Sequence, residues 1–328
     1  MTNDVVRILS VAIARKASDI HLSVGRPPIL RVNGELCDLP DAAALDAESC
    51  REMVYSFLSE AQRARLEEDL ELDCSFAVPG LGRFRANVLY QRGSVECALR
   101  AVPSVVPTPE SLGLGPGAMS LADLPRGLVL VTGPTGSGKS TTLACLIERI
   151  NATTRRHVLT IEDPIEFIYP RRQALIRQRE VGSDTKSFAQ ALRHALREDP
   201  DVILIGEMRD LETISLALTA AETGHLCLST LHTLDSVQSI NRIIDVFPSH
   251  QQAQVRVQLA GALKGVISQT LLPRREGTGR IAARELMLVN AAVANLIREA
   301  KTHMITTTIE TSGALGMFTL DRSQAALV

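Results

Sequence analysis

The stretch Gly133-Pro134-Thr135-Gly136-Ser137-Gly138-Lys139-Ser140 fits the pattern G-x-x-x-x-G-K-[ST], which is typical of a phosphate-binding loop. The apolar run 127–132 precedes it and has the length of a buried strand. Residues 139–150 follow it and place their apolar side chains on one helical face. Strand, glycine loop and helix are the context that the motif requires, and this context disfavours the alternative of a plain glycine turn.

Each residue type in the loop has a chemical reason. Glycines let backbone N–H groups close around phosphate oxygens, and the start of the following helix adds a positive partial charge. We expect Lys139 to reach the β- and γ-phosphates, and the Ser140 hydroxyl to bind Mg²⁺. The sequence therefore predicts ATP and Mg²⁺ as ligands, with the phosphates held by Gly133, Pro134, Thr135, Gly136, Ser137, Gly138, Lys139, Ser140 and Thr141.

Composition narrows the class of protein. The chain of 328 residues is long enough for two domains, and its 45% apolar content supports full cores. A formal net charge of -2 argues against nucleic acid as a partner. No uninterrupted apolar run has the length of a membrane span, and the N-terminus lacks a signal-peptide pattern. Scattered cysteines without a C-x-x-C pair indicate reduced thiols, so we expect a cytoplasmic protein.

Three regions follow one another along the chain. Residues 1–102 mix helical patterns with short strand patterns, which predicts an α+β domain. Residues 103–118 are rich in proline and glycine and are expected to form a linker. Residues 119–328 carry apolar strands that alternate with helices, which predicts an α/β domain with a parallel sheet. The expected strands there are 127–132, 157–161, 201–205 and 225–230.

Local signals predict several elements of the first domain. Asn33-Gly34 after the strand pattern 28–32 indicates a hairpin, and Asp46 is a plausible N-cap for one or two helices that reach Glu68. Three strands are expected at 72–78, 83–90 and 95–102.

Carboxylates follow two apolar strands of the second domain. Glu162 and Glu166 come after 157–161, and Glu207 comes after 201–205. Ligands bind at the carboxyl ends of parallel strands, so these acids are candidates for catalysis, although each could also be a solvated loop residue. Gly206 stands where a Walker B aspartate would be, so Glu207 is expected to be the carboxylate nearest to the metal and the attacking water.

Histidines and arginines are weaker candidates. His225 and His232 bracket the strand 225–230, where a histidine can sense the γ-phosphate or serve as a structural hydrogen-bonding group. Arg83, Arg85, Arg92 and Arg100 of the first domain could neutralise charge on a transferring phosphoryl group, or could face solvent. The basic run 171–179 is expected to be a solvated connecting segment.

Longer motifs resemble the type II secretion and type IV pilus motor ATPases, and in particular the PilT-like pilus retraction ATPases, from about Ala17 to Leu320. Residues 196–210, Leu-Arg-Glu-Asp-Pro-Asp-Val-Ile-Leu-Ile-Gly-Glu-Met-Arg-Asp, match the family's signature. Further similar motifs are the Asp box at 160–166, the His box at 221–233 and the opening segment at 17–22. Because the motifs are long and keep the family's order, the resemblance is specific.

The resemblance implies a PAS-like N-terminal domain joined to a RecA-like P-loop ATPase domain. It implies a homo-hexameric ring with nucleotide held between the two domains, near a subunit boundary. By matching motif, Glu207 corresponds to the Walker B glutamate, Glu162 and Glu166 to the Asp-box acids, and His225 and His232 to the His-box residues. Arg83, Arg85, Arg92 and Arg100 fall in the segment that closes over nucleotide.

The implied activity is ATP hydrolysis that powers type IV pilus retraction and twitching motility. The implied partner is an inner-membrane pilus platform protein, reached from the inner face of the cytoplasmic membrane without a membrane span. Two features depart from the family pattern: Ala294 replaces the first arginine of the motif A-I-R-N-L-I-R-E, and the chain ends at Val328 before the usual helical tail.

Three rival functions follow from the same residues. A pilus-assembly or secretion ATPase of the same family would commonly add a long N-terminal extension and a four-cysteine zinc element, neither of which we find in this sequence. A nucleotide-binding switch or a small-molecule phosphotransferase would share the phosphate loop, but not the long match to the motor signature.

Overall fold

The computed structural model describes residues 1–103, 105–275 and 279–327. The chain divides into two compact units, Met1–Ser104 and Val105–Val328. Ser104 of the expected linker, and 276–278 and 328 of the expected second domain, lie outside the described residues.

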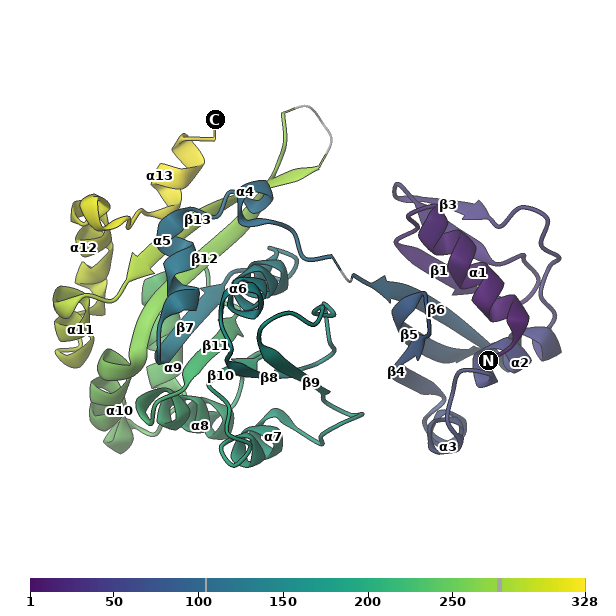
Figure 1. The fold of residues 1–328 in the computed structure, drawn as a ribbon, viewed down its shortest axis with the longest axis horizontal. Helices are drawn as coiled ribbons and strands as arrows, with labels where there is room; N and C mark the ends of the chain where they lie inside the picture. The colour runs from purple at the N-terminus through teal and green to yellow at the C-terminus, as the bar shows by residue number, and fades with distance from the viewer. Residues whose placement is uncertain (104, 276–278, 328) are drawn as a thin grey trace. The chain divides into compact units, whose positions relative to one another are not determined.

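The first unit is built on an antiparallel sheet (Figure 1). Its strands are β1 (Asp19–Leu22), β2 (Ile29–Val32), β3 (Glu35–Asp38), β4 (Glu71–Val78), β5 (Gly82–Gln91) and β6 (Ser94–Val102), in the order β3-β2-β1-β6-β5-β4. Its helices are α1 (Asn3–Ala14), α2 (Ala47–Tyr55) and α3 (Glu60–Asp69). The helices pack on one face of the sheet, where Leu9, Val54, Leu66 and Phe84 are fully buried.

Local signals for this unit are confirmed. Asn33 and Gly34 both have positive φ and form the turn of the β2–β3 hairpin. The Asp46 carboxylate accepts a hydrogen bond from the Ser49 N–H at 2.7 Å and caps α2. Ser59 and Gln62 form a capping box that begins α3, so the predicted helical region is two helices.

A mixed sheet of seven strands forms the second unit, in the order β13-β12-β7-β11-β10-β8-β9. The strands are β7 (Gly127–Thr132), β8 (His157–Glu162), β9 (Leu175–Glu180), β10 (Val202–Ile205), β11 (Leu226–Leu231), β12 (Leu263–Pro273) and β13 (Arg280–Leu288). Neighbouring strands are parallel except for β12 and β13, which pair antiparallel.

Helices cover both faces of this sheet (Figure 1). They are α4 (Pro109–Leu112), α5 (Pro116–Met119), α6 (Lys139–Thr153), α7 (Phe188–Ala195), α8 (Leu211–Glu222), α9 (Ser236–Asp245), α10 (Ser249–Ala262), α11 (Ala291–Arg298), α12 (Ile305–Thr311) and α13 (Leu320–Ala325), with 3-10 turns η1 (Ser120–Asp123), η2 (Thr302–Met304) and η3 (Gly313–Leu315). One apolar core lies between the sheet and α5–α6, and another between the sheet and α7–α12. Every residue of β7 is buried, as expected for a central parallel strand.

Two segments differ from the sequence expectations. Residues 105–118 belong to the second unit, where α4 and α5 form and Leu114 and Ala118 are buried. The basic run 171–179 was expected to be only a connecting segment, which is wrong, because β9 forms from Leu175 and pairs with β8. Strand β9 stands at the sheet edge, so its arginines remain partly exposed and no apolar alternation marks it.

Several loops of the second unit lie together at the carboxyl ends of its parallel strands. The phosphate loop follows β7, His232 follows β11, Glu207 follows β10, and Glu162 ends β8. Because β7, β11, β10 and β8 are consecutive in the sheet, these residues come from four adjacent strand ends.

Candidate functional site

The phosphate loop closes tightly around its own backbone. Gly133, Gly136 and Gly138 all have positive φ, which favours glycine at these positions. A Cβ on Gly133 would collide with the carbonyl oxygen of Gln269, so a larger residue there would push the loop away from β12. The Ser137 hydroxyl is buried and has no hydrogen-bond partner among the residues that the structure describes.

Lys139 begins α6 and turns its ammonium back over the loop. Its Nζ donates hydrogen bonds to the carbonyl oxygens of Gly133 at 2.8 Å and Pro134 at 3.0 Å. Burial lowers the pKa of Lys139, and the nearby Glu207 carboxylate opposes this shift. Among the residues that the structure describes, both hydrogen bonds of this buried cation go to neutral carbonyls, so its donors can be transferred to phosphate oxygens.

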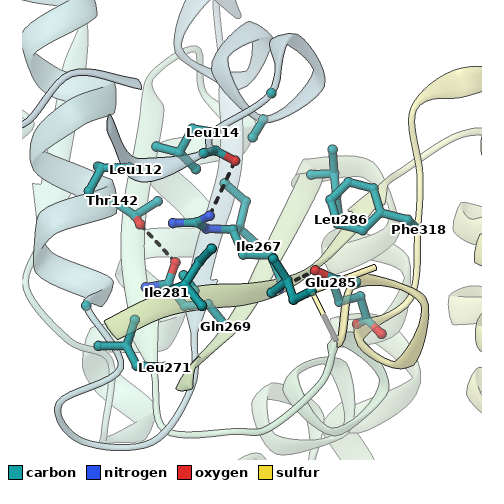
Figure 2. Close-up of a pocket in the computed structure, with 18 of the residues that line it drawn as sticks. Leu112, Leu114, Thr142, Ile267, Gln269, Leu271, Ile281, Glu285, Leu286 and Phe318 are labelled. Carbon is teal, nitrogen blue, oxygen red and sulfur yellow. Dashed lines mark hydrogen bonds between the residues drawn. The ribbon is translucent and has the colours of Figure 1, made fainter. Parts of the chain in front are cut away.

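Gln269 supports the loop from the neighbouring strand. Its Nε2 donates to the carbonyl oxygen of Ser137 at 2.6 Å, and its Oε1 accepts from the Thr142 hydroxyl at 2.8 Å (Figure 2). Strand β12 thereby fixes both the loop and the first turn of α6. Sequence reasoning missed this residue, although a polar run Ser268-Gln269-Thr270 within an apolar strand is a detectable signal.

Glu162 is a buried carboxylate held by three donors. Its Oε1 accepts from the Thr160 hydroxyl at 2.7 Å and from Gln178 Nε2 at 3.2 Å, and its Oε2 accepts from the Glu166 N–H at 3.2 Å. Burial raises the pKa of Glu162, although these hydrogen bonds stabilise its charged form. Glu166 itself is half-buried and contributes its backbone to this cluster.

Glu207 lies beside a guanidinium and an imidazole at the end of β10. Its Oε1 is 2.7 Å from Arg209 Nε, and its Oε2 is 3.5 Å from His232 Nε2. The carboxylate also lies close enough to Lys139 to influence its pKa. The structure therefore brings Lys139, Glu207 and His232 together, and it adds Arg209, which sequence reasoning did not single out.

Gly206 allows two strand ends to approach closely. A Cβ at this position would lie 3.3 Å from the carbonyl oxygen of Ile161 and 3.4 Å from the Cα of Glu162. An aspartate would have to push these neighbours apart. Glycine at 206 therefore fits this close approach, and the carboxylate of β10 stands one residue later, at Glu207.

His225 does not join these residues. It precedes β11, its Nδ1 is 3.0 Å from the carbonyl oxygen of Ala220, and the six residues of β11 separate it from His232. That length of strand corresponds to about 20 Å. Within this unit His225 therefore lies at the amino ends of the parallel strands, and His232 lies at their carboxyl ends. A catalytic role for His225 remains a prediction.

The four candidate arginines all lie in the first unit. Arg85 and Arg100 face each other across β5 and β6, on the side of the sheet opposite the helices. Arg83 donates to the Ser75 hydroxyl at 2.5 Å, Arg100 pairs with Asp19 at 2.6 Å, and Arg92 has positive φ in the β5–β6 turn. A role in closing over nucleotide remains a prediction for each of them.

A cavity of about 610 Å³ adjoins the phosphate loop (Figure 2). It is bounded by Ser137, Gly138 and Thr142 on one side, by β12 and β13 below, and by residues 110–118. Leu112, Leu114, Ile267, Leu271, Ile281, Leu286 and Phe318 make its lining largely apolar.

These features fit ATP and Mg²⁺. The loop offers backbone N–H groups at the start of a 15-residue helix, a buried lysine, and the Ser137 hydroxyl, which has no hydrogen-bond partner within the described part of the chain. Ser140 is exposed at the first turn of α6, and Glu207 supplies a carboxylate from the facing strand end. A hydroxyl and a carboxylate are oxygen ligands of the kind that Mg²⁺ prefers.

The parallel sheet, the phosphate loop and the acidic strand ends define a P-loop nucleotide-binding protein of the α/β class. The chain belongs to the Type II/IV secretion system protein family, whose model matches residues 1–320, and it falls among the PilT-type ATPases.

Curated relatives cover most of the chain. It is 50% identical over 327 residues to the type IV pilus retraction ATPase PilT of Pseudomonas aeruginosa, covering 99% of this chain and 94% of that one. It is 48% identical over 303 residues to a twitching motility protein of Neisseria gonorrhoeae, covering 92% of this chain and 80% of that protein. It is 35% identical over 298 residues to the pilus assembly ATPase PilB of Thermus thermophilus, covering 82% of this chain but 30% of PilB.

Solved structures agree with this placement. The crystal structure of the pilus retraction motor PilT with bound ADP has a TM-score of 0.87 at 50% identity, covering 98% of this chain and 96% of that one. The ATPase DotB of Legionella pneumophila has a TM-score of 0.80 at 28% identity, and the match covers 98% of this chain and 94% of that one. The predicted fold, a P-loop ATPase domain with a smaller N-terminal α+β domain, is confirmed. Within the part of the chain that the structure describes, no helix is long and apolar enough to cross a bilayer.

Proposed function

We propose that this protein is the ATP-hydrolysing motor of type IV pilus retraction. It works as a homo-hexamer in the cytoplasm, at the inner face of the cytoplasmic membrane, on an inner-membrane pilus platform protein. The observation that supports this most strongly is the cluster of Lys139, Glu207 and His232 beside the phosphate loop, in a chain that is 50% identical to a retraction ATPase along nearly its whole length.

Residues 133–141 bind the phosphates of ATP in this proposal. Backbone N–H groups of the loop and the start of α6 face the phosphate oxygens, and Lys139 exchanges its two carbonyl bonds for the β- and γ-phosphates. Ser140 and Glu207 would hold Mg²⁺, which neutralises charge on the phosphate oxygens.

Two carboxylates divide the chemistry. Glu207 orients the attacking water and accepts its proton, since it is only partly buried and lies next to Lys139. His232, near Glu207, is placed to respond to the γ-phosphate. Glu162 supports the water from the next strand end. Glu166 positions Glu162 through its N–H.

Retraction of the pilus, as opposed to its assembly, separates this proposal from the alternative of an assembly ATPase of the same family. A strain without this gene should carry excess pili and lose surface motility, because assembly continues without retraction. A gene copy with Glu207→Gln should not restore motility, whereas one with Glu310→Gln, an exposed carboxylate on α12, should. Loss of pili from the deletion strain would instead indicate an assembly motor.

A further inference from the structure

Glu285 of β13 is a buried carboxylate that holds the start of a helix (Figure 2). It is 5% exposed, and it forms no ion pair among the residues that the structure describes. Its Oε1 accepts from the Ser236 N–H at 2.8 Å and from the Ser236 hydroxyl at 2.6 Å. Burial raises the pKa of Glu285, whereas these two hydrogen bonds stabilise its charged form. Because Ser236 is the fully buried first residue of α9, Glu285 fixes the point at which this helix begins.

Helix α9 begins shortly after His232, and hydrogen bonds make the intervening turn one unit with the helix. The Thr233 hydroxyl lies 2.6 Å from the Ser239 hydroxyl, which donates to the carbonyl oxygen of Asp235 at 2.6 Å. The Asp235 carboxylate caps the helix by accepting from the Gln238 N–H at 2.7 Å. A displacement of the start of α9 would therefore move the turn with it.

The position of His232 depends on its backbone. Its side chain is 45% exposed, and within the described part of the chain its ring has one polar contact, from Nε2 to the Glu207 carboxylate at 3.5 Å. On one side of His232 the backbone is fixed, because Leu231 pairs with Thr132 in the sheet. On the other side the backbone enters the turn that Glu285 anchors.

Glu285 also continues a row of buried polar residues that begins beside the phosphate loop. Thr132, the residue before Gly133, donates from its hydroxyl to Ser268 Oγ at 3.0 Å, and both residues are fully buried. Ser268 stands directly opposite Glu285 in the pairing of β12 with β13, so their side chains point to the same face of the sheet. The row thus gives the phosphate loop and the start of α9 a common support across the sheet.

We propose that Glu285 is a positioning residue for ATP hydrolysis, which anchors the start of α9 and thereby keeps His232 beside Glu207. The inference rests on the proposed function, in which Glu207 orients the attacking water and His232 responds to the γ-phosphate. Glu285 touches neither nucleotide nor water in this account, so its whole effect passes through His232. Its loss should therefore lower kcat without weakening the binding of ADP, which has no γ-phosphate.

Phosphate release and ADP calorimetry on the full chain test this role. Glu285→Ala leaves both Ser236 donors buried without their acceptor, so kcat should fall ~10-fold while the dissociation constant for ADP stays unchanged. Glu285→Gln retains an acceptor oxygen for Ser236 and should keep more of the wild-type rate. Glu310→Ala, at an exposed carboxylate on α12, is the matched control and should release phosphate like the wild type.

A double-mutant cycle separates positioning from general support of the fold. His232→Ala should lower kcat, and Glu285→Ala should cause no further loss in that background. Ser236→Ala removes only the hydroxyl donor and replaces Glu285→Ala in the cycle if that variant does not fold, with a smaller loss of kcat expected. Losses that multiply in the double variant, a wild-type kcat in either single variant, or an equal weakening of ADP binding would overturn this inference alone. Wild-type protein that releases no phosphate from ATP would overturn the proposed function instead.

Discussion

Gln269 and Ser137, 132 residues apart in the sequence, are joined by a hydrogen bond of 2.6 Å from the Gln269 amide to the Ser137 carbonyl. The same amide accepts from Thr142, so one side chain on β12 holds both the phosphate loop and the start of α6. Since a phosphate loop binds through the positions of its N–H groups, this support is part of the binding site.

Replacing Gln269 should therefore weaken nucleotide binding. Gln269→Ala removes the donor to Ser137 and leaves the buried Thr142 hydroxyl without its acceptor. We expect these two losses to reduce the free energy of ADP binding by about 1–2 kcal/mol. The dissociation constant for ADP, measured by calorimetry, should rise roughly 5- to 30-fold. Gln254→Ala, at an exposed position on α10, is the matched control and should bind as the wild type does. Equal affinities for both variants would show that Gln269 does not support the loop.

Glu207 should be required for turnover but not for binding. Glu207→Gln keeps the shape of the side chain and removes the carboxylate, so ATP should still bind while phosphate release falls by on the order of 10² or more. The exposed Glu310→Gln should release phosphate at the wild-type rate. An unchanged rate in Glu207→Gln, together with an inactive Glu162→Gln, would exchange the roles of these two acids.

Glu162 should give the protein a distinct pH dependence. Because burial raises its pKa above 4.5, the folded carboxyl keeps its proton at pH values where the unfolded one has lost it. The stability that this group contributes is present below pH 4.5 and is lost as the pH rises through the raised pKa. Between pH 4.5 and pH 7.5, Glu162→Gln should thus lose less stability than the wild type in urea unfolding. If the free energy of unfolding changes with pH in the same way for both proteins, the pKa of Glu162 is not raised by folding.

Contiguous signals made much of the fold predictable. The strand β7, the loop and α6 occupy one uninterrupted stretch, and the Asp46 and Asn290 caps each need only the residue three positions later. The Asn290 side chain accepts from the Val293 N–H at 2.9 Å and caps α11. Within that helix Ala294 is half-buried against the core, whereas Arg298 is exposed.

Features that depend on long-range register were not predictable. Gln269 and Arg284 reach the loop and the cavity only because β12 pairs with β7 and β13 pairs with β12, and no local pattern encodes that order. Strand β9 is the outermost strand and most of its side chains are at least partly exposed, so its sequence shows no alternation of apolar and polar residues. His225 and His232 are close in sequence, but an intervening extended strand separates them.

Hydrolysis at the phosphate loop is the central claim, and phosphate release from purified Lys139→Ala tests it most directly. Lys139 is a buried cation over the loop, so its removal should weaken ATP binding and reduce phosphate release to background. Lys186→Ala, which changes an exposed lysine before α7, should release phosphate like the wild type. Phosphate release from Lys139→Ala at the wild-type rate would contradict the assignment of this loop as the site of ATP hydrolysis.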